Sequence, residues 1–236
     1  MKNSFLSMLA IVATALLAQP AAGAGQLTPH KAQYQVRVSV VSGQLNTELR
    51  ATGDGYIATH RIKPTGISRL LAHGKMSVTS EFTSAPDGVR PVSFHEIDTI
   101  GDNPETDIRF DWSTNVASGT VGTEAVRLQL DGISYDNVSI QYELMHDLLN
   151  DGPSQTYVLF DVDKMRVANV RNIGTRSIET SAGRFEAVGI QHQKEGSSRT
   201  TTLWCAPELD YLPVIIEQHR KGKVKFRATL TSYSPT

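Results

Sequence analysis

The stretch that most constrains the fold lies between Thr200 and Tyr233 and predicts three antiparallel strands joined by two turns. Its last strand alternates apolar with polar positions, and the apolar set is Val224, Phe226, Ala228 and Leu230. A period of two is typical of a strand with one buried side and one solvent-facing side. Gly222 allows the positive φ of the tight turn before this strand. Pro207 lacks an amide proton, so we expect the first strand to end at about Ala206.

The rest of the chain shows the same alternation. The ranges 32–40, 45–51 and 56–62 are joined by short glycine-containing turns and predict an antiparallel meander. Further strands are expected at 76–82, 92–98, 108–112, 126–130, 156–162, 166–172, 175–180 and 184–190. The polar residues 99–107 predict a loop, and its acidic side chains lack the spacing of a calcium-binding loop.

One long helix is expected, over residues 137–150. Ile140, Leu144 and Leu148 fall at i, i+4 and i+8, so they form an apolar stripe that can pack on a sheet. Asp136 is the expected N-cap of this helix. The ratio of strands to helix predicts a mainly β single domain, in which a curved antiparallel sheet or half-open β-barrel carries the helix.

Residues 1–24 have the organisation of a cleaved signal peptide. Lys2 supplies a positive charge, residues 5–17 are almost entirely apolar, and Ala22-Gly23-Ala24 fits the small-x-small cleavage pattern. The apolar run is shorter than the roughly 20 residues that a membrane-spanning helix needs. We therefore expect cleavage after Ala24, one domain over residues 25–236 with no transmembrane segment, and a periplasmic location.

Charge and cysteine content exclude further classes. The chain carries 23 Lys and Arg residues against 24 Asp and Glu residues, so it has no basic excess to bind nucleic acid. Its single cysteine, Cys205, cannot form an intrachain disulfide. Because Cys205 lies in a predicted strand, we interpret it as a small buried hydrophobe.

The sequence offers no recognisable catalytic or metal-binding motif. A G-x-S-x-G nucleophile elbow, a phosphate-binding glycine loop and a His-x-x-x-His pair are all missing. The histidines are scattered, although four of them fall in predicted strands, where two could meet: His60, His95, His192 and His219. We therefore expect no enzyme activity, no catalytic residues, no metal site and no cofactor.

An apolar surplus suggests ligand binding. The segment from Ile67 to Leu71 places Ile67, Leu70 and Leu71 at a helical spacing between Pro64 and Gly74, and it serves either as a plug of the core or as a lip over a cavity. Large aromatic side chains serve either as core pillars or as cavity walls. The candidate ligand-binding residues are Ile67, Leu70, Leu71, Trp112, Leu144, Trp204 and Tyr211.

Several motifs together resemble the DUF3108 family of exported bacterial proteins. They are Phe110-Asp111-Trp112, the run from Gly66 to Phe82, the Gly88…Pro91…Phe94 spacing and, most specifically, the segment LWCAPELDYLPV from Leu203 to Val214. This resemblance covers nearly all of the chain after Ala24 and implies no settled activity. The strand pattern is also similar to that of LolA/LolB-like periplasmic proteins, which implies a curved sheet around an apolar, lipid-sized cavity.

Two functions from different classes are consistent with these features. The first is an exported carrier or binding protein for an apolar ligand such as a lipid or acyl chain, and it requires an internal cavity. The alternative is a cell-envelope scaffold with a filled core that binds an envelope protein, and it requires an exposed apolar patch or an unpaired sheet edge.

Overall fold

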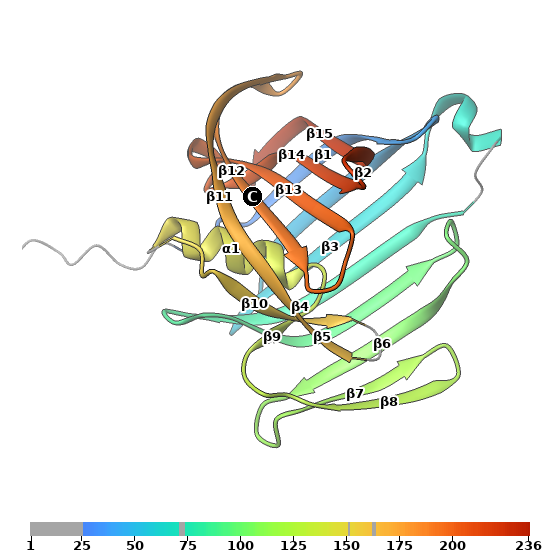
Figure 1. Ribbon diagram of the computed structural model, residues 1–236, viewed down its shortest axis with the longest axis vertical. Coiled ribbons are helices and arrows are strands. Elements are labelled where there is room, and N and C mark those ends of the chain that lie inside the picture. The colour runs from blue at the N-terminus through green and yellow to red at the C-terminus, as the bar shows by residue number, and fades with distance from the viewer. Residues whose placement is uncertain (1–25, 71–73, 151, 162–163) are drawn as a thin grey trace, which may run out of the picture.

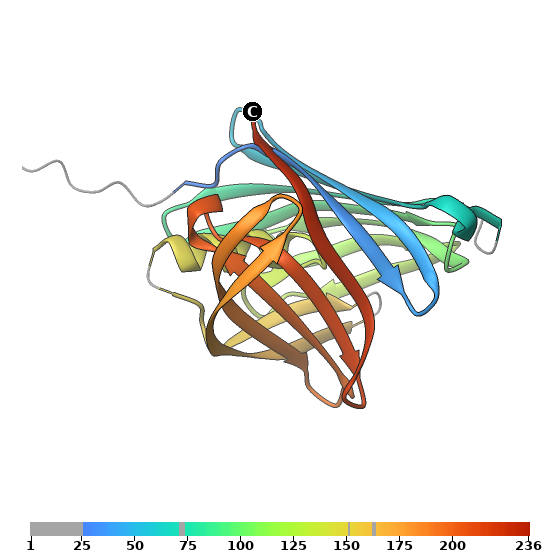
Figure 2. The ribbon, with the colours of Figure 1, turned by 90° about the horizontal axis from the view of Figure 1, so that it is seen from above.

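The computed structural model describes residues 26–70, 74–150, 152–161 and 164–236, so the predicted signal peptide lies outside it. In this described part, fifteen strands form a single sheet that curves strongly but does not close into a barrel (Figures 1 and 2). The strands are β1 His30–Val38, β2 Val41–Ala51, β3 Gly55–Pro64, β4 Met76–Ala85, β5 Gly88–Asp98, β6 Asn103–Asp111, β7 Val116–Val121, β8 Glu124–Gln129, β9 Ser134–Tyr135, β10 Thr156–Asp161, β11 Lys164–Thr180, β12 Gly183–Lys194, β13 Arg199–Ala206, β14 Leu212–Arg220 and β15 Lys223–Pro235.

The first and last strands, β1 and β15, are neighbours in the middle of this sheet. β1 pairs with both β2 and β15, so one half of the sheet runs outward from β1 to β8 and the other from β15 back to β9. All pairs are antiparallel except β9 with β10. The prediction of a mainly β single domain with a helix on a curved sheet is confirmed, and the two edge strands are β8 and β9.

The predicted alternation decides which side chains enter the core. In β1 the buried positions include Ala32, Tyr34 and Val36, and in β15 they include Ala228 and Leu230. The three C-terminal strands are confirmed, with the 3₁₀ turn η2, Pro207–Leu209, after the first of them. The concave side of the sheet therefore carries most of the apolar core.

The helix α1 spans Ser139–Leu149 and lies inside the curve of the sheet, packed on β5 and β4 (Figure 1). The prediction of Asp136 as the N-cap was wrong, because the N-cap position is taken by Val138, which makes no side-chain capping hydrogen bond. The Oδ1 of Asp136, two residues earlier, still accepts hydrogen bonds from the backbone N–H groups of Val138 and Ser139 at 2.8 and 2.9 Å. Its Oδ2 accepts the hydroxyl hydrogen of Ser80 at 2.7 Å, which ties the start of the helix to β4. No described helix is long and apolar enough to cross a membrane.

Some local predictions were wrong. Residues 103–107 form the first half of β6 instead of a loop, with buried Thr106 in phase with Ile108 and Phe110. β7 was not predicted, because Gly119 and its polar neighbours weaken the strand pattern. The two strands expected at 166–172 and 175–180 form one strand, β11, whose register shifts between Asn172 and Thr175.

Candidate functional site

A cavity of about 260 Å³ lies between the start of α1 and strands from both halves of the sheet. Its walls are mainly apolar. The apolar wall residues are Leu45, Ile62, Met76, Val78, Val138, Ile140, Leu144, Leu203, Ile216 and Phe226. They come from β2–β4, from α1 and the residue before it, and from β13–β15, so the curvature of the sheet is what brings them around one space. An apolar concavity with a few polar groups is the usual form of a small-molecule site.

Two histidines face this cavity from opposite halves of the sheet, His60 on β3 and His192 on β12. Burial lowers the pKa of each to about 4, with a smaller contribution from His30 for the first and from Lys194 for the second. Both imidazoles are therefore neutral near pH 7 and can exchange hydrogen bonds without carrying charge. The Nε2 of His60 lies 3.4 Å from the hydroxyl oxygen of Tyr142.

The remaining polar wall residues are Glu96, Asn137, Gln141 and Thr201. Burial, and secondarily the charge of Asp98, raises the pKa of the Glu96 carboxyl. The cavity thus has one carboxyl group on its β5 side and uncharged hydrogen-bonding groups elsewhere.

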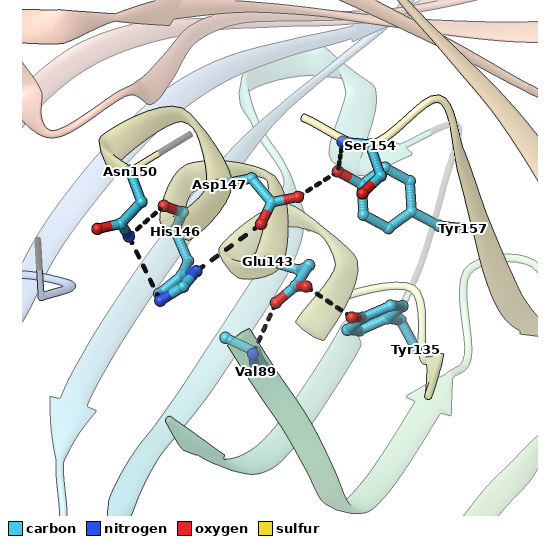
Figure 3. Close-up of polar contacts among 8 residues, drawn as sticks. All are labelled: Val89, Tyr135, Glu143, His146, Asp147, Asn150, Ser154 and Tyr157. Carbon is cyan, nitrogen blue, oxygen red and sulfur yellow. Dashed lines mark hydrogen bonds and ion pairs between the residues drawn. The ribbon is translucent and has the colours of Figure 1, made fainter. Parts of the chain in front are cut away.

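A polar network holds α1 against the sheet (Figure 3). Both carboxylate oxygens of buried Glu143 accept hydrogen bonds, one from the backbone N–H of Val89 and the other from the hydroxyl of Tyr135, each at 2.6 Å. Burial raises the pKa of Glu143 despite these two bonds. The network therefore fixes the helix that forms one wall of the cavity.

The next turn of α1 continues this network. Asp147 accepts a hydrogen bond from the hydroxyl of Tyr157, and its other oxygen lies 3.8 Å from Nδ1 of His146 (Figure 3). Glu143, His146 and Asp147 each present one ligand atom, and these atoms lie within 4.8 Å of one another. Because both carboxylates already accept hydrogen bonds from neighbouring elements, we interpret this trio as part of the framework of the site.

A second, polar space of about 340 Å³ adjoins the apolar cavity and shares His192 and Thr201 with it. We call its three cationic side chains, Arg166, Lys194 and Arg199, the basic rim. Asp161 lies among them and is paired with two, at 2.7 Å from Nε of Arg166 and 3.0 Å from Nζ of Lys194. Burial alone raises the pKa of Asp161, but these two cations outweigh it and hold the pKa below its usual value.

Of the seven predicted ligand-binding residues, Leu144 lines the cavity. Ile67 lies in η1, Gly66–Leu70, at the end of β3 distant from α1, and its side chain is 78% exposed (Figure 1). Leu70 belongs to the same turn, and Leu71 lies outside the described residues.

The three predicted aromatic residues pack elsewhere. Trp112 stacks on Phe110 and donates its indole N–H to the carbonyl of Pro91 at 2.6 Å. Trp204 is buried, but it follows Leu203 directly and so points to the other face of β13, where the guanidinium carbon of Arg176 lies 3.8 Å from its ring centre. Tyr211 follows η2 at a positive φ and packs against the core.

Sequence reasoning did not single out the polar members of the cavity. His60 and His192 were noted only as strand histidines, and Glu96, Gln141 and Thr201 were not selected. A usable signal exists in β12, where Ile190, His192 and Lys194 follow one another on one face. It becomes meaningful only once the neighbouring strands are placed.

Comparison with known proteins places the chain in a family. The model of a family described as "Protein of unknown function (DUF3108)" matches residues 32–229. The chain belongs to this family. No curated protein matches this DUF3108 protein.

Solved structures show a similar fold. A β-barrel-like protein of domain of unknown function DUF1849 from Brucella abortus is 12% identical to this DUF3108 protein, with a TM-score of 0.60 over 89% of this chain and 99% of the other. A candidate lipoprotein from Parabacteroides distasonis has a TM-score of 0.32 at 11% identity, covering 89% of this chain and 96% of its own. At these identities the first likeness shows the fold alone, and the second is too low to support an argument.

Proposed function

We propose that this DUF3108 protein is an exported, non-catalytic binding or carrier protein that holds an apolar ligand, such as a lipid or acyl chain, in the cavity beside α1. The apolar cavity itself is the observation that carries the proposal. A partly open, mainly apolar concavity of about 260 Å³ with a few polar groups in its walls has the usual form of a small-molecule site. Binding of an alkyl chain in this cavity would be favoured by roughly 0.8 kcal/mol of free energy for each CH₂ group that is removed from water.

The alternative, a scaffold that binds an envelope protein, is supported less well. It calls for a filled core and an accessible sheet edge or apolar patch. The edge strand β8 is only six residues long and carries Glu124 and Arg127, and charges on a short edge strand discourage pairing with another chain. The open cavity and this charged edge both favour the binding protein.

Native mass spectrometry of the protein purified from its exported compartment, followed by lipid extraction, tests the proposal. We expect a stoichiometric apolar adduct. Ile216→Trp and Met76→Trp enlarge side chains on opposite walls of the cavity, so each variant should lose the adduct. Ile67→Trp makes a similar enlargement at an exposed position, so this control should keep it.

Circular dichroism must first show that the variants fold. An adduct-free mass for the wild-type protein at every concentration, with no uptake of added fatty acid, would contradict the binding function. Loss of the adduct in Ile67→Trp as well would instead place the ligand at η1, consistent with a lip over a cavity at that segment.

A further inference from the structure

The concave face of β12, β13 and β14 changes from apolar to basic along the direction of the strands. The first level, beside the helix, is apolar and consists of Ile190, Leu203 and Ile216, which are adjacent in register. The second level, two residues further, is polar and consists of His192, Thr201 and Gln218. The third begins the basic rim, with Lys194 on β12 and Arg199 on β13.

This gradient fits the length of a small amphiphile. Strands rise about 3.3 Å per residue, so Ile190 and Lys194, four residues apart on one face, are separated by about 13 Å along β12. His192 and Thr201 belong to both the apolar cavity and the polar space, so one molecule could occupy the two spaces continuously.

The third level and its surroundings carry more positive than negative charge. Asp161 is engaged by Arg166 and Lys194, whereas no carboxylate among the described residues lies within ion-pair distance of Arg199. Arg199 is also directly opposite Arg220 in the β13–β14 ladder. Like charges placed opposite each other destabilise a sheet, and an anion bound between them would relieve the repulsion.

His192 adds hydrogen-bonding capacity at the boundary without adding charge. Because its imidazole is neutral near pH 7, the charged groups of the adjoining polar space are the three cations of the basic rim and the single carboxylate of Asp161. The guanidinium group of Arg199 presents several N–H donors in a planar fork that suits the two oxygens of a carboxylate or phosphate group.

We propose that the ligand is a single-chain anionic amphiphile, whose alkyl chain occupies the apolar cavity and whose carboxylate or phosphate head group binds the basic rim at Lys194 and Arg199. This assignment rests on the proposed binding function and specifies its ligand class. A fatty acid and a monoalkyl phosphate share the required chemistry.

The test compares three probes with one alkyl chain: dodecanoate, dodecanol and dodecylamine, titrated calorimetrically into the protein near pH 7 below their aggregation concentrations. We expect dodecanoate to bind about tenfold more tightly than dodecanol, since a charge-assisted hydrogen bond contributes on that scale. Dodecylamine should bind most weakly. Dodecyl phosphate in place of dodecanoate distinguishes the two anionic head groups.

Two variants locate the head group. Arg199→Gln and Lys194→Gln should each reduce the roughly tenfold preference for dodecanoate over dodecanol by about threefold and leave dodecanol binding unchanged. Arg184→Gln is the matched control, because Arg184 lies at the opposite end of β12 with an exposed side chain and should have no effect.

Other outcomes would overturn the inference in distinguishable ways. Equal binding of the three probes would contradict the anionic head group while leaving the apolar binding function in place. A preference for dodecylamine would contradict it and assign the polar end to Glu96 or Asp161. Failure of all three probes to bind would remove both the head-group assignment and the proposed function.

Discussion

His192 and Thr201 are directly opposite each other in the β12–β13 ladder, and this pair forms the boundary between the apolar cavity and the basic rim. On one side of the pair the same face carries Ile190 and Leu203, and on the other it carries Lys194 and Arg199. Because successive residues alternate between faces, four residues of each strand are enough to pass from core to charged surface. A gradient from apolar to basic side chains therefore needs no insertion or extra domain.

The neutral histidine of this pair predicts a pH effect on stability. Burial lowers the pKa of His192 to about 4 in the folded protein, whereas in the unfolded chain its imidazole has the ordinary pKa of 6.5. The unfolded state thus binds more protons in this window, and the folded state loses stability as the pH falls through it. Relative to His192→Gln, the wild-type protein should lose stability between about pH 6.5 and 4.

The comparison with a variant matters, because the raised pKa values of Glu96 and Glu143 act in the opposite direction and are common to both proteins. Urea unfolding followed by circular dichroism at several pH values measures the difference. His60→Gln should behave in the same way, since the pKa of His60 is also lowered to about 4. A stability difference that stays constant with pH would show that neither imidazole is held neutral.

Removing the carboxylate of Glu143 should loosen the helix from the sheet. Glu143→Ala leaves the buried N–H of Val89 and the hydroxyl of Tyr135 without their partner, so we expect a loss of about 2–4 kcal/mol in the free energy of unfolding. Tyr135→Phe breaks one of the two bonds and should cost less, about 1–3 kcal/mol. Denaturant unfolding measures both losses.

Glu124→Ala, on the exposed edge strand β8, is the control for these two variants and should change stability by less than about 0.5 kcal/mol. If Glu143→Ala were as mild as this control, the network in Figure 3 would not be what holds α1.

The fold was largely predictable, because strand alternation and helical spacing are local signals. β15 was identified from the period of two in Val224–Leu230, and α1 from the spacing of Ile140, Leu144 and Leu148. β7 lacked such a signal, since Gly119 interrupts it. Pairing of β1 with β15 depends on contacts between the two ends of the chain, which one-dimensional patterns do not encode.

The cavity was less predictable than the fold for the same reason. His60 and His192 approach one space only because the whole sheet curves, and nothing in the sequence near either residue indicates the other. Large aromatic residues such as Trp204 were reasonable candidates by size, but the face on which each one lies depends on strand register. Successive residues of a strand point to opposite faces of the sheet. A shift of the register by one residue therefore moves a side chain from the cavity to the outer face.

Gly189 provides a test of where Trp204 packs. A Cβ atom at Gly189 would lie 2.6 Å from Cγ1 of Ile173 and 2.8 Å from Cζ3 of Trp204. Gly189→Ala should therefore displace the indole and reduce the free energy of unfolding by about 1–3 kcal/mol. Tryptophan fluorescence and denaturant unfolding measure these changes.

Dodecanoate binding should be unaffected by Gly189→Ala, because the overlap lies on the face of the sheet away from the cavity. Gly53→Ala is the control, since a Cβ atom there meets nothing within 4 Å. A Gly189→Ala protein that is fully stable but no longer binds dodecanoate would place Trp204 in the ligand site after all.

The thiol of Cys205 should report on opening of the core. Cys205 is 1% exposed, and burial raises the pKa of its thiol, so in the folded protein it is neither accessible nor ionised. A thiol reagent such as dithionitrobenzoate should label the native protein only very slowly and label one equivalent rapidly in concentrated guanidinium chloride. A bound amphiphile stabilises the folded state by mass action, so added dodecanoate should slow the residual labelling under native conditions. Rapid labelling of the native protein would contradict the buried position, and labelling that dodecanoate does not slow would separate opening at Cys205 from the cavity.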